Sequence, residues 1–349
     1  MENNKKTIAL TGWATGGHIF PLLSVYNYFR DENKYNFVWV GEEDSMEQEI
    51  AEKNLIPFYD VPAGKVRRYF DMRNFFEPLK NLTGIIFALY YIWKYKIDIV
   101  FSKGWYVSLP LCIAAFIMRK PIYVHESDAV GWVANKVIGK LATKVFYTFE
   151  NELTASENTK FIESGPIMNS DLIDKLKNLY PEENDKLEVL VICGSQWSTA
   201  IFNSLLQILP DLKDINFNIV LGSKNSGMRS DFLRYLNVKT HEFVDQKDLW
   251  LMMKKADIAI TRGSSTLWEL NYFGIHSIIV PLPHSAGDHQ QKNAEFFHEK
   301  FGSNIVKENG TMNLELFRLL QGYKQMRKSQ LNLDKFFSAL HVFEENFDK

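Results

Sequence analysis

The segment Thr15-Gly-Gly-His18 combines a small-residue loop with an imidazole. It follows the apolar run Ile8–Leu10 and precedes an amphipathic helical pattern over Ile19–Phe29. The backbone amides of such a loop, with the N-terminus of the next helix, are typical of sites that bind phosphate and other anions. His18 would lie at the mouth of that site as a candidate base or as a donor to phosphate. The alternative interpretation is a tight turn with a capping histidine.

Two carboxylates follow another apolar run of the same half. His125, Glu126 and Asp128 come at the end of the expected strand Ile122–His125. Ligands of open α/β sheets collect at the carboxyl ends of the strands, so this position favours a role in acid–base chemistry. The alternative is that Ser127 or Asp128 only caps the next helix.

The second half repeats the combination of strand, small-residue loop and helix. Leu190–Ile192 runs into Gly194-Ser-Gln-Trp-Ser198, and Arg262-Gly-Ser-Ser-Thr266 opens another helical pattern. Small hydroxyl residues at a helix start suit phosphate binding, and Glu269 could accept hydrogen bonds from both hydroxyls of a ribose. Without such a ligand, Ser264 would be a helix cap and Glu269 a surface charge.

Amides and imidazoles are concentrated in the loop Pro281–Asn293. Gln290 and Gln291 could bind sugar hydroxyls. His284 and His289 could resemble metal ligands, but their spacing matches no zinc pattern. No Asp-x-Asp follows a strand either, so we expect no metal site.

Cations and aromatic residues are mixed in Lys65–Lys80, ahead of the apolar helical pattern Ile85–Tyr95. This composition is typical of a surface that rests on an anionic bilayer, with rings inserted and cations at the level of the head groups. The alternative is an amphipathic core helix with one solvated face. The residues that favour membrane contact are Arg67, Arg68, Arg73, Phe70, Phe75 and Phe76.

Composition restricts the class of protein. The chain has 349 residues, of which 46% are apolar and 23% charged, as in folded proteins of two domains. A net charge of −2 gives no indication of nucleic-acid binding. Cys112 and Cys193 lie in apolar runs and are expected to be free thiols in a reducing cytoplasm. The longest apolar stretch, Gly84–Trp93, is about half of the ~20 residues that a membrane span needs.

The elements that position these groups alternate between strand and helix along the chain. Near-continuous Val/Ile runs suit parallel strands buried on both faces, and the helical patterns between them indicate βαβ units. We expect an α/β protein with two Rossmann-like domains facing each other across a cleft, over 1–164 and 165–335, and a C-terminal helix over 336–349 that could pack back toward the first domain. The expected strands are Ile8–Leu10, Phe37–Val40, Ile97–Phe101, Ile122–His125, Val145–Tyr147, Val189–Ile192, Phe217–Leu221, Glu242–Val244, Ile258–Ile260 and Ser277–Val280.

Taken in this order, the segments resemble the MurG family, glycosyltransferases of the GT-B fold that move N-acetylglucosamine from UDP-GlcNAc to lipid I and so form lipid II. The resemblance extends over residues 6–300 and its motifs lie in both halves. The matching stretches are Thr15–Pro21, Tyr106–Ser108, His125–Glu126 with Ala134–Asn135, Gly194–Gln196, and Pro281–His284 with Asp288–Ala294.

The resemblance implies that the first half binds the lipid acceptor. His18 and Glu126 would act as base and partner. Thr15, Gly16 and Gly17 would hold the pyrophosphate. Tyr106, Asp128 and Asn135 would contact the acceptor. The second half would bind UDP-GlcNAc. Ser195 and Gln196 would form a second glycine-rich loop, and the backbone of Val244 would meet uracil. Arg262 and Thr266 would contact phosphate, and Glu269 would bind the ribose. Gln290 and Gln291 would bind the sugar.

The implied reaction is a single inverting displacement. A base takes the proton from the muramyl 4-hydroxyl, which attacks the anomeric carbon as UDP departs. Backbone amides and a helix dipole would stabilise the leaving charge, so neither a metal nor a cofactor is expected. The implied partners are UDP-GlcNAc, undecaprenyl-linked lipid I and the anionic inner face of the cytoplasmic membrane, with the protein cytoplasmic and peripheral on that membrane.

The chain departs from the family's pattern at several positions. The arginine that follows the family's interdomain Gly-Asn-Pro is missing from Ser164–Met168, and Arg262 is the nearest candidate to replace it. The family's His-Glu-Gln-Asn is His-Glu-Ser-Asp here, which places the charge of Asp128 beside the expected pyrophosphate. In four loops tryptophan stands where the family has glycine, and we interpret these codons as UGA, read as glycine by the source. The four positions are Trp13, Trp105, Trp132 and Trp197.

Other activities fit the same expected fold. A glycosyltransferase acting on diacylglycerol would share the donor half and the membrane surface. A UDP-sugar 2-epimerase would need carboxylates for epimerisation and no membrane surface. A non-catalytic sugar-nucleotide binder would have no need of both His18 and Glu126.

Overall fold

The chain forms two compact units, Met1–Ile173 with Phe337–Lys349, and Asp174–Phe336. The computed structural model describes residues 5–12, 16–30, 33–64, 77–129, 133–149, 159–169, 172–173, 185–194, 198–324 and 339–347, without the side chains of residues 16–18, 133–134, 136 and 286. No helix within these ranges is long and apolar enough to cross a membrane.

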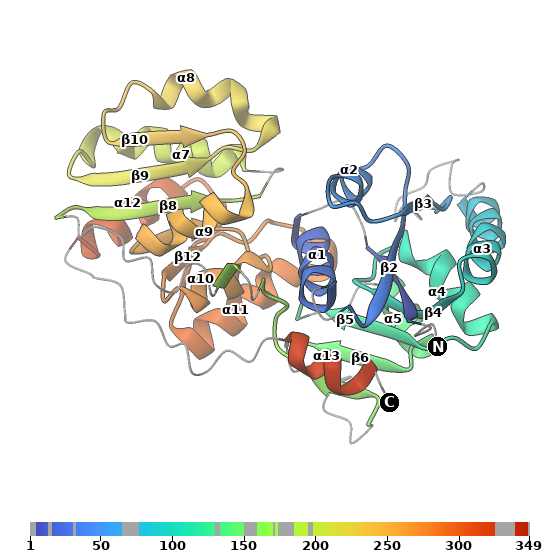
Figure 1. Ribbon diagram of the computed structural model, residues 1–349. Helices are drawn as coiled ribbons and strands as arrows, with labels where there is room; N and C mark the ends of the chain where they lie inside the picture. Colours follow the sequence, from blue (N-terminus) through green and yellow to red (C-terminus); the bar gives the residue numbers. More distant parts are fainter. Residues whose placement is uncertain are drawn as a thin grey trace. The chain divides into compact units, whose positions relative to one another are not determined.

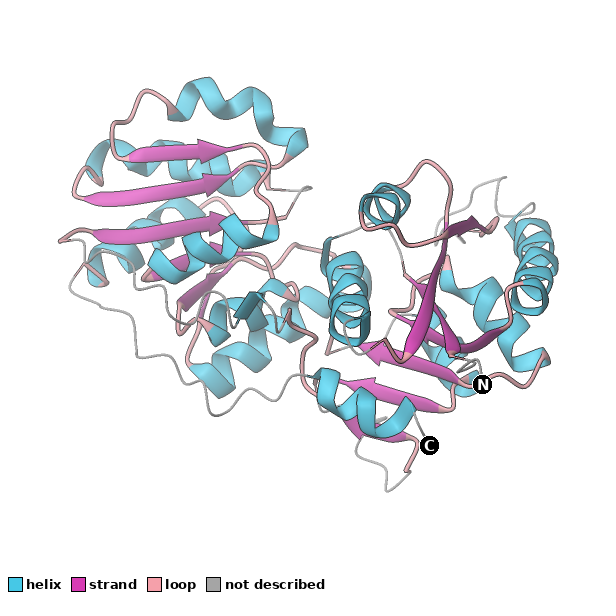
Figure 2. Ribbon diagram, viewed as in Figure 1, coloured by secondary structure: helices cyan, strands magenta, loops and turns pink. Residues whose placement is uncertain are grey.

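A parallel sheet of seven strands forms the centre of the first unit (Figure 2). Its strand order is β3-β2-β1-β4-β5-β6-β7. The strands are β1 Lys6–Thr11, β2 Tyr35–Gly41, β3 Phe58–Asp60, β4 Ile97–Ser102, β5 Ile122–Glu126, β6 Lys144–Tyr147 and β7 Phe161–Glu163.

Helices cover both faces of this sheet because side chains alternate along each strand. In β1, Ile8 and Leu10 belong to one core cluster, and Ala9 between them belongs to another. The first cluster is closed by α1 Gly16–Arg30, α2 Met46–Lys53 and α13 Ala339–Phe347. The second is closed by α3 Glu77–Lys94, α4 Ser108–Ile117 and α5 Val133–Leu141.

The C-terminal helix α13 packs on the first unit, beside β6 in Figure 1. The ring of Phe343 lies 4.7 Å from that of Phe146 and 5.0 Å from that of Phe101, measured between centroids. The Tyr28 hydroxyl lies 2.9 Å from His341 Nδ1. A segment distant in sequence thereby completes the core under β4 and β6.

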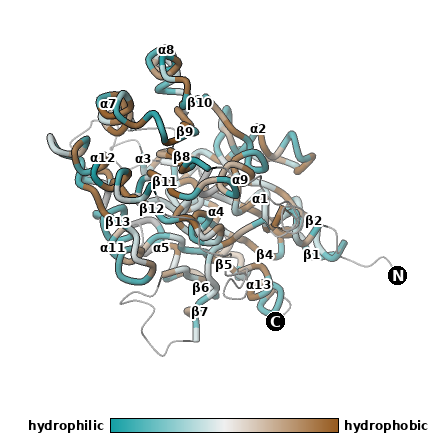
Figure 3. Tube along the Cα trace, turned by 90° about the vertical axis from the view of Figure 1, so that its left-hand side faces the viewer, coloured by the Kyte–Doolittle hydropathy of each residue, from teal (hydrophilic) through white to brown (hydrophobic). Residues whose placement is uncertain are grey.

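The second unit contains a parallel sheet of six strands in the order β10-β9-β8-β11-β12-β13. The strands are β8 Leu187–Ile192, β9 Ile215–Val220, β10 Val238–His241, β11 Ile258–Thr261, β12 His276–Ile279 and β13 Asn304–Ile305. The helices are α7 Thr199–Ile208, α8 Arg229–Phe232, α9 Gln246–Lys255, α10 Thr266–Tyr272, α11 His289–Phe301 and α12 Met312–Gly322, with short 3-10 turns at Leu209–Asp211, Ser223–Met228 and Ala286–Asp288. Hydrophobic and hydrophilic residues alternate along α7 (Figure 3), which buries Ile201, Phe202 and Leu205 against the sheet.

Nine of the ten expected strands are confirmed to within a few residues, and the expected strand Glu242–Val244 is wrong. The strand there is β10, Val238–His241, and residues 242–244 lie in the loop that follows it. β10 is the edge of its sheet and carries polar residues on its open side, so the more apolar Phe243–Val244 gave a misleading signal. Three short strands, β3, β7 and β13, were not expected.

The strand order of each sheet reverses at one point, between β1 and β4 in the first unit and between β8 and β11 in the second. In open parallel sheets, ligands bind outside the carboxyl ends of the strands at this switch point. The loops that follow these four strands are therefore the places to examine for a site.

Candidate active site

The carboxylate of Glu126 lies at the carboxyl edge of the first sheet, as the last residue of β5. Asn135, from α5, donates a hydrogen bond from Nδ2 to Glu126 Oε2 at 2.6 Å. The backbone N–H of Asp128 donates to Glu126 Oε1 at 3.2 Å. Both oxygens are thus held by the protein while the residue stays at the end of its strand, where the sequence predicted it.

The surroundings bring the proton affinity of Glu126 close to neutrality. Burial, and after it the nearby charge of Asp128, raises the pKa of its carboxyl group to about 7. The hydrogen bonds from Asn135 and from the Asp128 amide oppose this rise, as does the charge of Lys103. A carboxyl group with such a pKa can accept a proton at neutral pH and release it again, as general acid–base catalysis requires.

Lys103 is a member of this site that the sequence analysis missed. It follows β4 directly, its amide donates to Thr11 O at 2.9 Å, and the residue is only 2% exposed. Its Nζ lies 2.7 Å from His125 Nδ1. Burial lowers the pKa of Lys103 to about 8, while the charges of Glu126 and Asp128 act in the opposite direction. The feature of the sequence that could have indicated Lys103 is its position directly after a buried strand and before a glycine.

His125 is a neutral support for Lys103. Its Nε2 lies 3.0 Å from the carbonyl oxygen of Gly165, so this nitrogen carries the ring proton and Nδ1 accepts from the lysine. Burial and the charge of Lys103 hold the pKa of His125 well below its usual range. The imidazole is therefore uncharged at neutral pH.

The loop after β4 has two successive residues in the left-handed region. Gly104 has φ +83°, and a Cβ there would lie 1.9 Å from Asn135 Oδ1, so only glycine fits. Trp105 has φ +74°, and its amide donates to Asn135 Oδ1 at 3.0 Å. A left-handed conformation suits glycine and is costly for a bulky residue such as tryptophan, which supports a glycine at position 105. Asn135 connects this loop to Glu126, and its expected contact with an acceptor stays a prediction.

Tyr106 lies next in the same loop. Its hydroxyl donates to Glu42 Oε2 at 3.1 Å, and burial together with Glu42 raises the pKa of the phenol. The half-buried ring leaves part of its surface open. Its acceptor contact also stays a prediction.

Several predicted residues lie outside the described part of the chain or have undescribed side chains. They are Thr15, Gly16, Gly17, His18, Ser195 and Gln196, the tryptophans Trp13, Trp132 and Trp197, and the proposed membrane residues Arg67, Arg68, Arg73, Phe70, Phe75 and Phe76.

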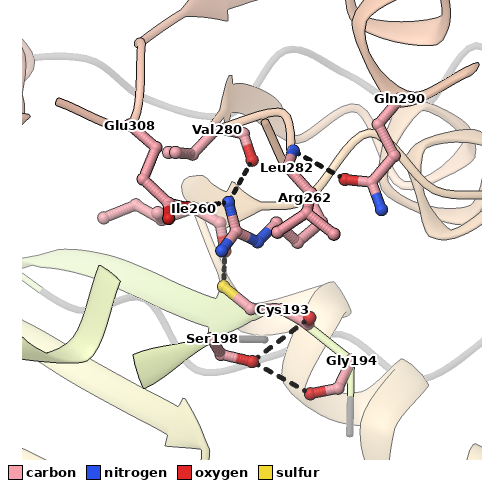
Figure 4. A network of polar contacts seen from close by, with 9 residues as sticks. All are labelled: Cys193, Gly194, Ser198, Ile260, Arg262, Val280, Leu282, Gln290 and Glu308. Atoms are coloured by element: carbon pink, nitrogen blue, oxygen red, sulfur yellow. Dashed lines mark hydrogen bonds and ion pairs between the residues drawn. The ribbon is translucent and has the colours of Figure 1, made fainter. Parts of the chain in front are cut away.

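The second unit brings three loops together at the carboxyl ends of β8, β11 and β12 (Figure 4). Gly194 follows β8 with φ +75°, and the Ser198 hydroxyl donates to its carbonyl oxygen at 3.3 Å ahead of α7. A Cβ on Gly263, after β11, would lie 2.1 Å from the carbonyl oxygen of Gln290, so the α11 loop can approach only a glycine. Asn293 Nδ2 donates to Gly263 O at 3.0 Å and fixes this approach.

The two expected sugar-binding glutamines already have protein partners. Gln290 Oε1 accepts from the Leu282 amide at 2.9 Å, which leaves its amide nitrogen without a bond to that loop (Figure 4). Gln291 Nε2 donates to Glu295 Oε1 at 2.8 Å, one turn along α11. Gln290 is thus oriented by the loop that follows β12.

Glu269 lies on α10 and is partly exposed. Trp250, fully buried on α9, donates from Nε1 to Glu269 Oε1 at 2.8 Å, and the Gln246 side chain is also bonded to the carboxyl group. Burial raises the pKa of Glu269, and the two hydrogen bonds oppose that rise. Thr266 begins the same helix. The two hydrogen bonds orient the carboxylate of this partly exposed residue, and its contact with a ribose stays a prediction.

Arg262 is directed into its own domain. Its Nη1 lies 2.6 Å from Glu308 Oε2 and donates to Val280 O at 3.0 Å (Figure 4), and the side chain is 4% exposed. The arginine therefore joins β11 to the segments after β12 and β13. We expected it to contact a phosphate; Nη1 has partners within the protein, and the phosphate contact stays a prediction.

The loop after β10 contains Val244, which is partly exposed, and its contact with uracil stays a prediction. Its neighbour Phe243 is 75% exposed, and the sequence analysis missed it because that segment was taken for a strand. Among the described residues, no three His, Cys, Asp or Glu side chains are grouped closely enough to hold a metal ion.

Comparisons with known proteins cover both units. The profile of the glycosyltransferase family 28 N-terminal domain matches residues 8–147, and that of the glycosyltransferase family 28 C-terminal domain matches residues 188–341. A Clostridium botulinum UDP-N-acetylglucosamine--N-acetylmuramyl-(pentapeptide) pyrophosphoryl-undecaprenol N-acetylglucosamine transferase is 30% identical over 94% of this chain and 92% of its own. The Clostridium perfringens protein of the same name is 31% identical over 97% and 94%.

Solved structures show the same fold. Acinetobacter baumannii MurG superposes with a TM-score of 0.75 at 22% identity, covering 99% of this chain and 100% of that one. A Neisseria meningitidis UDP-GlcNAc 2-epimerase superposes with a TM-score of 0.70 at 14% identity, covering 98% and 99%. Such likenesses at low identity establish the two Rossmann-like domains of the GT-B fold. The near-full-length identity to the clostridial transferases goes further, and it shows that this chain belongs to the MurG family of glycosyltransferases.

Proposed function

We propose that this chain transfers N-acetylglucosamine from UDP-GlcNAc to the muramyl 4-hydroxyl of lipid I, with inversion at the anomeric carbon. The observation that carries the proposal is the buried Glu126 carboxyl at the carboxyl edge of β5, with a pKa near neutrality. Relatives of the same length are named for this transfer. A group of this kind is what deprotonation of a sugar hydroxyl at neutral pH requires.

The chemical step needs one proton transfer and one displacement. The carboxylate of Glu126, with His18 as its partner, takes the proton of the 4-hydroxyl. The hydroxyl oxygen then forms a bond to the anomeric carbon as the bond from that carbon to the β-phosphate oxygen breaks and UDP leaves. Backbone amides of the loops after β8 and β11 would stabilise the leaving charge.

UDP-GlcNAc would bind the second unit. Glu269 is held ready to accept from the ribose hydroxyls, and Thr266 at the start of α10 would meet phosphate, with Ser195 and Gln196 forming the facing loop. The oriented Gln290 and its neighbour Gln291 would bind the sugar. Beside Val244, the exposed ring of Phe243 offers a stacking surface for uracil, an interaction worth about 1–3 kcal/mol per base.

The first unit would rest on the anionic inner face of the cytoplasmic membrane through α3. Ala88 and Ile92 face the core, while an apolar stripe at helical spacing faces outward. Its members are Leu79 (66% exposed), Leu82 (57%), Ile86 (59%), Tyr90 (47%) and Trp93 (71%). One apolar face of α3 packs on the sheet, and the opposite apolar face is exposed and suited to contact lipid.

Cations flank this stripe, as an anionic surface requires. Lys80 and Lys94 are exposed near the two ends of α3, and Lys94 Nζ lies 5.2 Å from the centroid of the Tyr90 ring. Arg67, Arg68 and Arg73 precede α3 in the sequence. Contact with a bilayer would bring the pyrophosphate and sugar of a membrane-held lipid acceptor to the edge of the first sheet.

Vesicle binding tests this surface. The double variant Leu82→Glu with Ile86→Glu should lose binding to phosphatidylglycerol vesicles in a sedimentation assay while keeping turnover on a detergent-soluble acceptor. Leu236→Glu is the matched control, because Leu236 is fully exposed on the second unit and should leave vesicle binding unchanged. Equal vesicle binding by wild type and the α3 variant would show that the exposed apolar stripe of α3 does not contact the membrane.

Turnover variants test the catalytic assignment. Glu126→Gln and His18→Ala should each lower kcat by about 10²–10⁴ with little change in UDP affinity, because both residues belong to the first unit. Glu163→Gln is the control, since Glu163 is an exposed carboxylate at the end of β7 in the same sheet. If either active-site variant mainly loses nucleotide binding, the assignment of acceptor and donor to the two units is wrong.

A further inference from the structure

We propose that Lys103 is a positioning residue of this reaction: its buried ammonium group balances the paired carboxylates of Glu126 and Asp128 and keeps Glu126 able to accept the acceptor's proton. The inference rests on the proposed role of Glu126. It assigns a function to a residue that touches none of the reacting atoms.

The backbone places Lys103 where it can act on the site. It follows β4, one of the two strands at the switch point of the first sheet, and its amide is bonded to Thr11 O at the end of β1. β5 is the neighbour of β4, with Ser102 paired to Val124, so Lys103 and Glu126 extend from adjacent strands at the same edge.

The ammonium group is held in place. His125 Nδ1 accepts from Lys103 Nζ at 2.7 Å, and the opposite ring nitrogen is held by Gly165 O at 3.0 Å. The Thr148 hydroxyl lies 3.4 Å from the same Nε2. Because the imidazole is neutral and fixed on both sides, it directs the lysine without adding a charge.

The charges of the cluster require this cation. Among the described residues, the ionisable groups that act on the Glu126 carboxyl are Asp128 and Lys103, and those that act on Lys103 are Glu126, Asp128 and His125. A negative charge near a buried carboxyl group favours the protonated form of that group unless a cation offsets it. A proton on Glu126 would remove its capacity to act as base.

Asp128 and Lys103 bring opposite charges to Glu126. Asp128 stands where the resemblance has a neutral asparagine, which adds one negative charge beside Glu126. Lys103 supplies one positive charge to the same cluster. The charge of Lys103 therefore opposes that of Asp128, and removing either group alone should shift the balance at Glu126.

The pH dependence of kcat/KM on lipid I tests the inference. With Lys103→Met the rise of kcat/KM with pH, which follows ionisation of Glu126, should move to higher pH by about one unit, a roughly tenfold loss on the acidic limb that recovers at alkaline pH. Asp128→Asn should move the rise to lower pH. The double variant should lie between the two, because it removes one charge of each sign.

Lys120→Met is the matched control. Lys120 is a lysine at the opposite end of the same strands, paired with Asp98 at 3.1 Å, and its loss should leave the profile unchanged. The KM for UDP-GlcNAc should be unchanged in all four variants, because that substrate belongs to the second unit.

A lysine that only supports the fold would give a different result. Lys103→Met would then lower kcat/KM by the same factor at every pH, and Asp128→Asn would not shift the profile, which would overturn the inference. If Lys103→Met does not fold, judged by circular dichroism, the shift of Asp128→Asn to lower pH and the return of the profile toward that of wild type in the double variant still decide it. Loss of activity in Glu126→Gln with unshifted profiles in these variants would refute the role of Lys103 and leave the proposed function standing.

Discussion

Removing the carboxylate of Glu269 should weaken UDP binding tenfold to hundredfold. In the structure one carboxyl oxygen accepts from Trp250 Nε1 at 2.8 Å, and the group has further lone pairs for the two ribose hydroxyls. Hydrogen bonds to a charged group contribute about 1.5–3 kcal/mol, and each 1.4 kcal/mol changes a Kd about tenfold. Calorimetric titration of Glu269→Ala with UDP measures this loss directly.

The same substitution should also destabilise the second unit, and the two effects can be separated. Glu269→Ala leaves the indole N–H of the fully buried Trp250 without this acceptor, which costs about 1–3 kcal/mol. Trp250→Phe removes the same hydrogen bond but keeps the carboxylate, which Gln246 still contacts. This control should lower the melting temperature while UDP affinity stays near that of wild type.

Two results would contradict this reasoning. Unchanged UDP affinity in Glu269→Ala would remove the ribose role. If Trp250→Phe lost as much affinity as Glu269→Ala, the effect would come from helix position and not from the carboxylate.

The pKa of Glu126 is about 7 in the folded state, against an ordinary 4.5. Between pH 4.5 and 7 the folded state therefore binds more protons than the unfolded state, so the free energy of unfolding falls as pH rises through this range. Glu126→Gln should therefore melt higher than wild type at alkaline pH, with the difference disappearing in acid; a lower melting temperature at alkaline pH refutes the pKa assignment. EDTA should leave turnover unchanged, and activity that is lost and then restored by magnesium would indicate a different transferase class. The codons for Trp105 and for the other three tryptophans that replace a glycine of the family should be UGA, and mass spectrometry should find glycine at these positions in peptides of the native protein. UGG codons would exclude this reading. If the protein does contain tryptophan, Trp105→Gly should raise activity, because φ +74° suits glycine.

The fold could be predicted from the sequence because buried parallel strands have a strong hydrophobic signal. Glu126 was identified for a related reason, since a polar residue directly after such a strand lies at the edge where ligands bind. The edge strand β10 was not predicted because half of its residues, Val238–His241, are polar, and burial of only one side weakens the hydrophobic pattern of a strand.

The partners within the site could not be predicted, because they depend on tertiary contacts. Arg262 pairs with Glu308, which is distant in sequence and approaches only when β11, β12 and β13 are aligned. Burial of Lys103 was equally invisible, since lysine is usually exposed and nothing in the local sequence indicates its contact with His125. The sequence thus located the loops of the site, and the packing of the strands determined which side chains meet there.

Labelled UDP-GlcNAc supplied with lipid I or with diacylglycerol, followed by mass spectrometry of the products, distinguishes the proposed transfer from the alternative activities. We expect release of UDP and formation of lipid II with a β-linked N-acetylglucosamine in the presence of lipid I, and no transfer to diacylglycerol. Transfer to diacylglycerol, or conversion of UDP-GlcNAc to its 2-epimer without any acceptor, would contradict the proposed transfer.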